Sequence, residues 1–126
     1  MSIGVSHTDF VIVNVTDFER SRAFYGETLG LTPGKPWGEL PAQEFETGNL
    51  TIAVVDPTCI GRDFPGPSQT TIALRVADVA AARDQLESSG VVFFGETIDS
   101  GVCHIAPFAD PDGNSLMLHH RYAPES

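Results

Sequence analysis

The second half of the sequence repeats the pattern of the first half. Asp17 and Asp78 each precede an apolar helical face, as helix-capping residues do. Asp17 and Asp78 are 61 residues apart, and the same spacing separates Tyr25 on the first helical face from Leu86 on the second. Each copy reads as a strand, a helix and then three strands, which predicts an α+β fold built from two βαβββ modules. We expect their two curved mixed sheets to enclose a cleft.

The expected modules occupy about residues 8–60 and 70–121 of a single domain, 1–126. The proline- and glycine-rich residues 31–41 should hold only a short, irregular edge strand. Pro107 lies inside an interior strand and lacks an N–H group, so we expect a bulge or a short neighbouring strand beside it. The expected helices are 18–29 and the segment from 79 to Gly90, and the expected strands are 9–15, 42–46, 50–55, 70–76, 91–94 and the two arms of a hairpin around 110–114.

The segment Asp110-Pro111-Asp112-Gly113 is typical of a tight turn, because proline presets φ at its second position and glycine accepts a positive φ at its end. A three-residue loop closed by a bulge would place Asp110 opposite Asn114. His104 and His120 would then pair on one face of the hairpin, with His119 on the other. A two-residue loop would instead bring His104 beside His119, and that register stays open.

Two motifs resemble those of a known superfamily. The segment Asp17-Phe-Glu-Arg-Ser-Arg-Ala-Phe-Tyr25, followed by Leu29-Gly30-Leu31, is similar to the first-helix signature of the vicinal oxygen chelate superfamily. Asp110–Asn114 is similar to the final turn of that group, which includes glyoxalase I, extradiol dioxygenases, fosfomycin-resistance enzymes and bleomycin-resistance proteins. The resemblance spans about residues 8–120. It implies the paired βαβββ fold, and either an enzyme or a binding protein.

Catalytic members of that superfamily bind a divalent metal with His, Gln or Glu on the first and last strands of the modules. The resemblance maps these positions onto Phe10 and Ile52 in the first module, and onto Thr71 and Met117 in the second. None of these side chains is a good ligand for a hard divalent ion. We therefore expect no metal and no other cofactor, which argues against glyoxalase I activity. The alternative is a divalent transition metal held by a non-standard set that includes His119.

Side chains alternate along a strand, so residues two or four positions from these expected ligand positions should also face the cleft. His119 could act as a base or a donor to a ligand, or it could be a strand-end histidine bonded to water. Arg75 could bind a ligand, or it could pair with a surface carboxylate. Trp37 could stack over a flat ligand, or it could cover a sheet edge or a dimer contact. No catalytic residue is assigned, and the candidate ligand-binding residues are Phe10, Asn14, Trp37, Ile52, Thr71, Arg75, Met117 and His119.

The charge balance restricts the possible partners. With 17 acidic and 7 basic residues, the net charge of −10 argues against nucleic acid as a partner. No apolar run is long enough for a membrane span, and the N-terminal residues do not resemble a signal peptide, so a cytoplasmic location is expected. The cysteines Cys59 and Cys103 match no metal spacing and no disulfide framework.

Together these features predict a metal-independent small-molecule-binding protein that resembles bleomycin-resistance proteins. Its ligand would be organic, cationic or aromatic, and would lie in an apolar cleft. Bleomycin-resistance proteins resemble paired dimers, so a homodimer is expected. One alternative is a metal-dependent lyase, isomerase or dioxygenase of the same superfamily. Another is a regulatory module that exposes an apolar patch to a partner.

Overall fold

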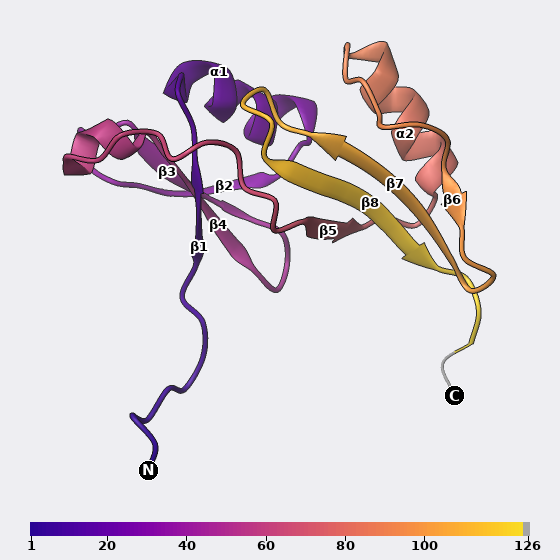
Figure 1. Cartoon of the computed structure of the whole chain (residues 1–126), viewed down its shortest axis with the longest axis horizontal. Coiled ribbons are helices and arrows are strands. Elements are labelled where there is room, and N and C mark those ends of the chain that lie inside the picture. Colours follow the sequence, from indigo (N-terminus) through magenta and orange to yellow (C-terminus); the bar gives the residue numbers. More distant parts are fainter. Residues whose placement is uncertain (125–126) are drawn as a thin grey trace. The chain divides into compact units, whose positions relative to one another are not determined.

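Two four-stranded mixed sheets with the same connectivity make up the computed structural model, which describes residues 1–124 (Figure 1). The chain divides into two compact units, residues 1–66 and 67–126. The first sheet has the order β1-β4-β3-β2 and the second has the order β5-β8-β7-β6. In each, the first and last strands of the unit are parallel and the other pairs are antiparallel. The predicted α+β fold of two βαβββ repeats is confirmed.

The elements follow the predicted order in both units. The first unit contains β1 (Val11–Asn14), α1 (Phe18–Ala23), the π-helical turn η1 (Phe24–Thr28), β2 (Thr32–Pro36), β3 (Ala42–Glu46), β4 (Thr51–Val55) and the 3-10 turn η2 (Pro57–Ile60). The second contains β5 (Ile72–Arg75), α2 (Val79–Ser88), β6 (Ile98–Asp99), β7 (Cys103–Ala109) and β8 (Ser115–Arg121). Among residues 1–124, no helix has the length and apolar character of a membrane span.

Both helices begin at the predicted capping residues. The Asp17 side chain accepts a hydrogen bond from the Arg20 N–H at 3.1 Å, and the Asp78 side chain accepts one from the Ala81 N–H at 3.0 Å. Each carboxylate satisfies a backbone donor that has no partner within the first helical turn. The caps therefore fix where each helix starts.

The first sheet buries one face beneath α1 and η1. Tyr25 of η1 is fully buried, and its ring lies 6.2 Å from that of Phe45 on β3. Phe45 lies opposite Ile52 of β4, and Ile52 pairs in turn with Val11 of β1. These residues share one face because cross-strand partners point to the same side. The helix-covered face also buries Val13, Val15 and Val54.

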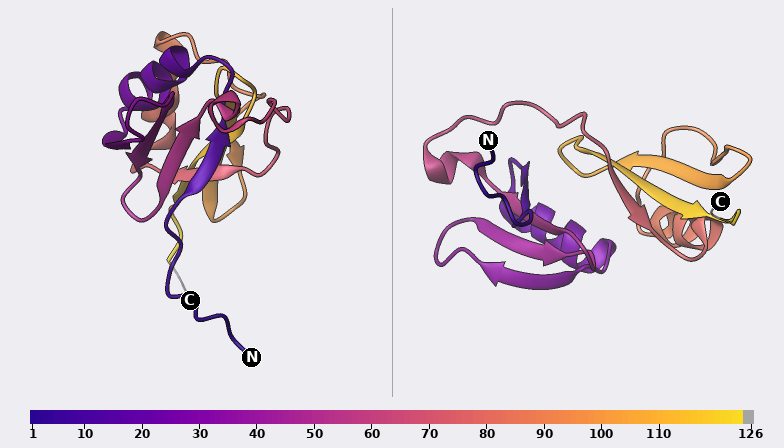
Figure 2. Two further views of the ribbon diagram at one scale, coloured as in Figure 1. Left: turned by 90° about the vertical axis from the view of Figure 1, so that its left-hand side faces the viewer. Right: turned by 90° about the horizontal axis from the view of Figure 1, so that it is seen from below.

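In the second unit, α2 covers the equivalent face of the sheet (Figure 2, right). The helix residues Val79 and Leu86 are buried there. Phe108 of β7 packs against Phe93, with ring centroids 5.0 Å apart. The Arg83 guanidinium of α2 lies over the Phe93 ring at 4.6 Å. This stacking ties the helix to the segment before β6. The same core contains Ala106, Leu116 and Leu118.

The predicted strand at 91–94 is wrong. Only an isolated bridge from Phe93 to Phe108 forms there, and the strand beside β7 is the two-residue β6. In an antiparallel pair, every second residue directs its N–H group to the same neighbouring strand. The Asp110 N–H donates to the Asn114 carbonyl at the start of β8, so Pro107, three residues earlier, directs its nitrogen to the other side, toward β6. Pro107 offers no donor to that side, and the neighbouring strand is short, as the sequence predicted.

The final hairpin has the predicted three-residue loop. The Gly113 N–H donates to the Asp110 carbonyl at 3.0 Å, and Gly113 has a φ of +88°. Along the arms, Pro107 pairs with Met117 and His104 pairs with His120. The alternative register that would place His104 beside His119 is excluded.

Candidate functional site

The face of each sheet away from its helix, termed here its far face, carries most of the candidate residues. On the first sheet, Trp37 and Phe10 meet edge to face, with ring centroids 5.5 Å apart and an interplanar angle of 62°. The Trp37 Nε1–H donates a hydrogen bond of 3.0 Å to Oε2 of Glu44. Two residues expected to contact a ligand, Phe10 and Trp37, are therefore brought together, and a carboxylate joins them.

The backbone places these three side chains where they meet. Glu44 lies on β3 opposite Ala53, and the Trp37 N–H donates to the Ala42 carbonyl at 3.0 Å. The indole packs on a buried cluster that β3 and β4 present on this face, together with Cys59 of η2. That cluster consists of Ala42, Ala53 and Val55.

This aromatic–carboxylate group suits an organic cation. Phe10 remains 38% exposed, so one ring of the pair is accessible. The Oε1 atom of Glu44 makes no hydrogen bond with any of residues 1–124, which leaves it able to accept a donor from a ligand. Aromatic faces attract cations, and an ionised acceptor strengthens a hydrogen bond. Trp37 packs on the far face of β3 and β4, not over a sheet edge, and it leaves Phe10 accessible.

Glu44 was not predicted as a site residue. A usable signal was present, because Ala42, Glu44 and Glu46 alternate with the core residue Phe45 along one short strand. That alternation places Glu44 on the face opposite Phe45. Its proximity to Trp37 was not predictable, because it depends on the irregular pairing of β2, whose register shifts between Pro33 and Pro36.

Ile52 does not line the far face, which corrects the prediction. It is fully buried on the helix-covered face, opposite Phe45. The first hairpin turns through Gly48 and Asn49, since the Thr47 N–H donates to the Leu50 carbonyl, and this loop is shorter than the three-residue loop of the second hairpin. Counting from the turn glycine therefore gives a register error of one residue, which reverses the face of a strand. Ala53, the partner of Ile12, is the residue equivalent to Met117.

On the second sheet, the remaining candidates share the far face. Met117 of β8 lies between Ala73 of β5 and Pro107 of β7. At one end of this row, the hydroxyls of Thr71 and Ser115 are 2.6 Å apart. The far face of the second sheet is thus apolar in its middle and polar at its end.

Arg75 and His119 lie at the opposite end of that face. They are direct partners across β5 and β8, and His119 also pairs with Ile105 of β7. The surface salt bridge considered for Arg75 does not form with any of residues 1–124. The corresponding position in the first sheet is held by Asn14, which pairs with Val55.

The donors at the expected metal positions do not fit a divalent metal. With Ala53 replacing Ile52, the four positions offer two hydrocarbon side chains (Phe10 and Ala53), one hydroxyl (Thr71) and one thioether (Met117). Hard divalent ions prefer carboxylate, carbonyl and water oxygens, and transition metals favour imidazole or thiolate. Within residues 1–124, no three His, Cys, Asp or Glu side chains gather closely enough to hold a metal ion.

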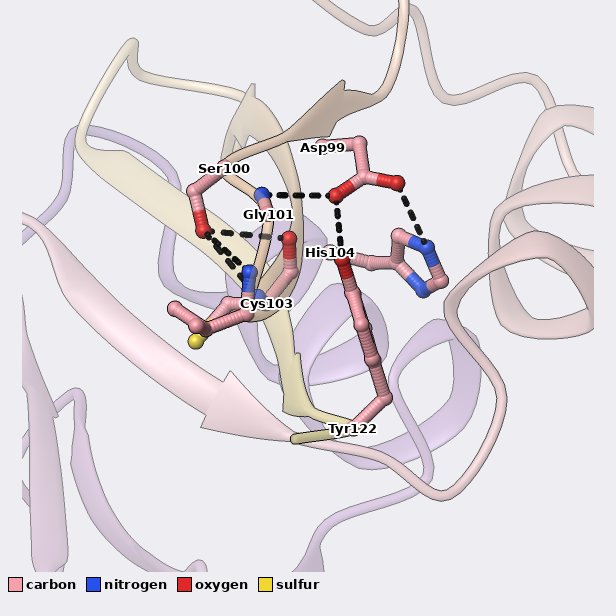
Figure 3. Close-up of polar contacts among 7 residues, drawn as sticks. Asp99, Ser100, Gly101, Cys103, His104 and Tyr122 are labelled. Carbon is pink, nitrogen blue, oxygen red and sulfur yellow. Dashed lines mark hydrogen bonds and ion pairs between the residues drawn. The ribbon is translucent and has the colours of Figure 1, made fainter. Parts of the chain in front are cut away.

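His104 belongs to a separate polar cluster at the end of the second sheet (Figure 3). Asp99 accepts a hydrogen bond of 2.7 Å from the Tyr122 hydroxyl and one of 2.8 Å from the Gly101 N–H. His104 Nε2 lies 3.5 Å from the other Asp99 oxygen. The Tyr122 hydrogen bond lowers the pKa of Asp99 below its ordinary 3.8, and the same bond raises the pKa of Tyr122 above 10.0. His104 therefore has a structural partner, on the face opposite His119.

A family model described as Glyoxalase/Bleomycin resistance protein/Dioxygenase superfamily matches residues 4–118. No curated protein matches the chain. Among solved structures, an antibiotic binding protein from a Streptomyces strain is 27% identical with a TM-score of 0.76, and the match covers 95% of this chain and 99% of the other.

Two further structures share the fold at lower identity. A lactoylglutathione lyase from Agrobacterium tumefaciens is 16% identical with a TM-score of 0.75, over 92% of this chain and 94% of its own. A glyoxalase/bleomycin resistance protein/dioxygenase from Nocardioides is 17% identical with a TM-score of 0.70, over 98% and 93%. At this identity, the likeness concerns the fold alone.

Proposed function

Because the chain belongs to the glyoxalase/bleomycin resistance protein/dioxygenase superfamily, we propose that it is a metal-independent binding protein for an organic molecule with a planar, cationic part. The observation that carries the proposal is the group formed by Phe10, Trp37 and Glu44 on the far face of the first sheet. One similar structure is that of an antibiotic binding protein, which is consistent with a binding role.

Each member of the group has a separate role in the proposal. Phe10 offers a partly exposed ring against which a flat ligand packs. Trp37 holds Glu44 through its indole N–H, which fixes the carboxylate beside the two rings. Glu44 supplies the negative charge through the oxygen that Trp37 leaves unused. The net charge of −10 adds a long-range attraction for cations.

A matched pair of probes tests the charge preference. N-methylquinolinium and neutral quinoline have similar shapes, and both can be titrated by calorimetry and by fluorescence, since Trp37 is the only tryptophan of the chain. The Glu44→Gln variant should bind N-methylquinolinium about tenfold more weakly and quinoline equally well, because only the charged interaction is lost. Glu27→Gln, on η1, which covers the opposite face of the sheet, is the control. If neither probe binds the wild-type protein, the proposed site is wrong.

The same preparation tests metal independence. Protein purified without an affinity tag should contain far less than one equivalent of transition metal. Addition of Mn²⁺, Ni²⁺ or Zn²⁺ should leave its melting temperature unchanged, because an ion that bound the folded state would raise it. A stoichiometric metal would favour the enzyme alternative, in which His119 is a ligand.

A further inference from the structure

Arg75 and His119 form a pair of hydrogen-bond donors, termed here the donor pair, that the first unit lacks. They are adjacent on the far face of the second sheet, and the Val76 N–H donates to the His119 carbonyl at 3.1 Å. Neither side chain makes a hydrogen bond or an ion pair with any of residues 1–124. Asp99, the one acidic residue in strands β5–β8, pairs with His104 and so lies on the other face.

The internal repeat shows that the fold does not require this pair. Asn14 and Val55 occupy the same two positions in the first sheet, and the Val15 N–H donates to the Val55 carbonyl at 2.9 Å, as Val76 does to His119. The backbone arrangement is therefore the same with neutral side chains. Arg75 is exposed and His119 is half-buried, so both side chains present their donors to a ligand acceptor instead of to the rest of the chain.

An apolar strip leads away from the donor pair across the same face. Met117 lies between Ala73 and Pro107, and Ile105 lies directly beside His119. Met117 and Ile105 are half-buried, so each exposes part of its surface. The strip ends at the Thr71–Ser115 hydroxyl pair. Thr71 directly precedes β5 and lies four residues before Arg75, which is about 13 Å at the rise of an extended strand.

We propose that this strip binds an organic monocarboxylate. The carboxylate would accept hydrogen bonds from the Arg75 guanidinium, whose planar fork matches two oxygens, and from a ring N–H of His119. The apolar body of the ligand would cover Met117 and Ile105, where methionine adapts to different shapes. This site has the opposite charge preference to the site of the proposed function, and it does not depend on that site.

Benzoate and its neutral isostere benzamide are the probes, followed in amide NMR spectra of the full chain. Benzoate should shift the amides of Ala73, Arg75, Met117 and His119 in a saturable manner. Benzamide should bind about 10- to 100-fold more weakly, as expected for losing hydrogen bonds to charged groups. Inorganic phosphate should also bind more weakly than benzoate, because it gains nothing from the apolar strip. Equal binding of phosphate would overturn the assignment of an organic ligand.

The double variant Arg75→Asn/His119→Val carries the side chains that the first unit uses at the same place, so it should fold. It should lose benzoate binding about 10- to 100-fold, whereas Arg62→Gln, an exposed arginine of the first unit, should not. Arg75→Gln alone gives a second test if the double variant is unstable. Unchanged benzoate affinity in these variants would overturn the proposal. Trp37 fluorescence with N-methylquinolinium reports separately on the first unit, so failure of either site is recognised independently.

Discussion

The Trp37 side chain is fixed from three directions. Its N–H is bonded to Glu44, its ring meets Phe10, and its body packs on the alanine and valine cluster of β3 and β4. An aromatic ring held in this way loses little conformational entropy when a ligand packs beside it. The arrangement is therefore suited to binding, since the cost of ordering the side chain has been met during folding.

The Asp99–Tyr122 contact gives a prediction for pH dependence. Tyr122→Phe removes the hydrogen bond that chiefly lowers the pKa of Asp99, so that pKa should rise toward 3.8. Carboxyl ¹³C NMR titration measures it directly. Ser88→Ala, a surface change on α2, should leave the Asp99 titration curve as in the wild-type protein. An unchanged curve in Tyr122→Phe would contradict the assigned cause.

The sign of the effect on stability follows from the same two shifts. A lowered carboxyl pKa stabilises the folded state above about 3.8, and this contribution is lost as the pH falls through the pKa of folded Asp99. A raised phenol pKa stabilises the folded state below about 10.0, and this contribution is lost as the pH rises through the pKa of folded Tyr122. The difference in melting temperature between wild type and Tyr122→Phe should therefore be greatest between these limits.

At the level of single elements, the final turn is held by a chain of hydrogen bonds. Asp110 Oδ1 accepts from the N–H groups of Asp112 and Asn114, and Asp110 Oδ2 accepts from the Asn114 amide. Asn114 Oδ1 then accepts from the Ser68 N–H at 2.8 Å, and the Ser115 N–H donates to the Ser68 carbonyl. The turn thus anchors the segment that leads into β5.

Asn114→Ala should break this anchor. The buried Asp110 carboxylate would lose one donor and the Ser68 N–H would lose its acceptor, at a cost of about 1–3 kcal/mol in unfolding free energy. Denaturant unfolding measures the loss, and faster hydrogen exchange at Ser68 would locate it. Asn49→Ala, at the exposed turn of the first hairpin, is the control and should change stability little. Equal losses in both variants would contradict the anchoring role.

Local signals predicted most of the elements, because their causes lie within a few residues. The caps at Asp17 and Asp78 and the turn at Asp110–Gly113 depend on side chains that bond their own neighbouring backbone. The predicted strand at 91–94 failed because Pro107, on a strand distant in sequence, supplies no donor to pair with it. Strand pairing depends on such partners, which a local pattern does not specify.

Within the site, face assignments succeeded wherever the register was correct. Arg75, Met117 and His119 share the far face of the second sheet, as their parity predicted. Ile52 was assigned to the wrong face because its position was counted from the turn glycine in the same way as in the second hairpin. That glycine is the first residue of the two-residue loop in the first hairpin, but the last residue of the three-residue loop in the second. The contact between Trp37 and Glu44 lay beyond sequence reasoning, since an irregular strand and a loop position the indole.

At the scale of the whole molecule, the two units share a backbone plan but differ in surface chemistry. The first presents aromatic rings with a carboxylate on its far face, and the second presents the Arg75–His119 donor pair with an apolar strip. The second unit also exposes several large apolar side chains around β6, which are Val92, Phe94, Ile98 and Val102. Exposed apolar side chains of this size are candidates for a surface that associates with a partner.

We propose that the chain forms the homodimer that the resemblance implies, and these residues test it. Light scattering should give a mass of twice 13.5 kDa for the wild-type chain. Phe94→Ser/Ile98→Ser should shift the mass toward that of the monomer, because exposed apolar area would be lost from the interface. Leu40→Ser/Ile60→Ser, which changes comparably exposed residues in the first unit, is the control. A monomeric wild-type protein at every concentration would contradict the dimer.

For protein design, the composition of the strand after each turn shows which hairpin tolerates a change in loop length. Lengthening or shortening a hairpin loop by one residue exchanges the two faces of the strand that follows. In β4 the residues Ile52–Val55 are all apolar, so either face could fill a core. In β8 the same exchange would bury His119 and expose Leu118. A change in the length of the first loop could therefore bring new side chains of β4 onto the far face, whereas the length of the second loop has to stay as it is.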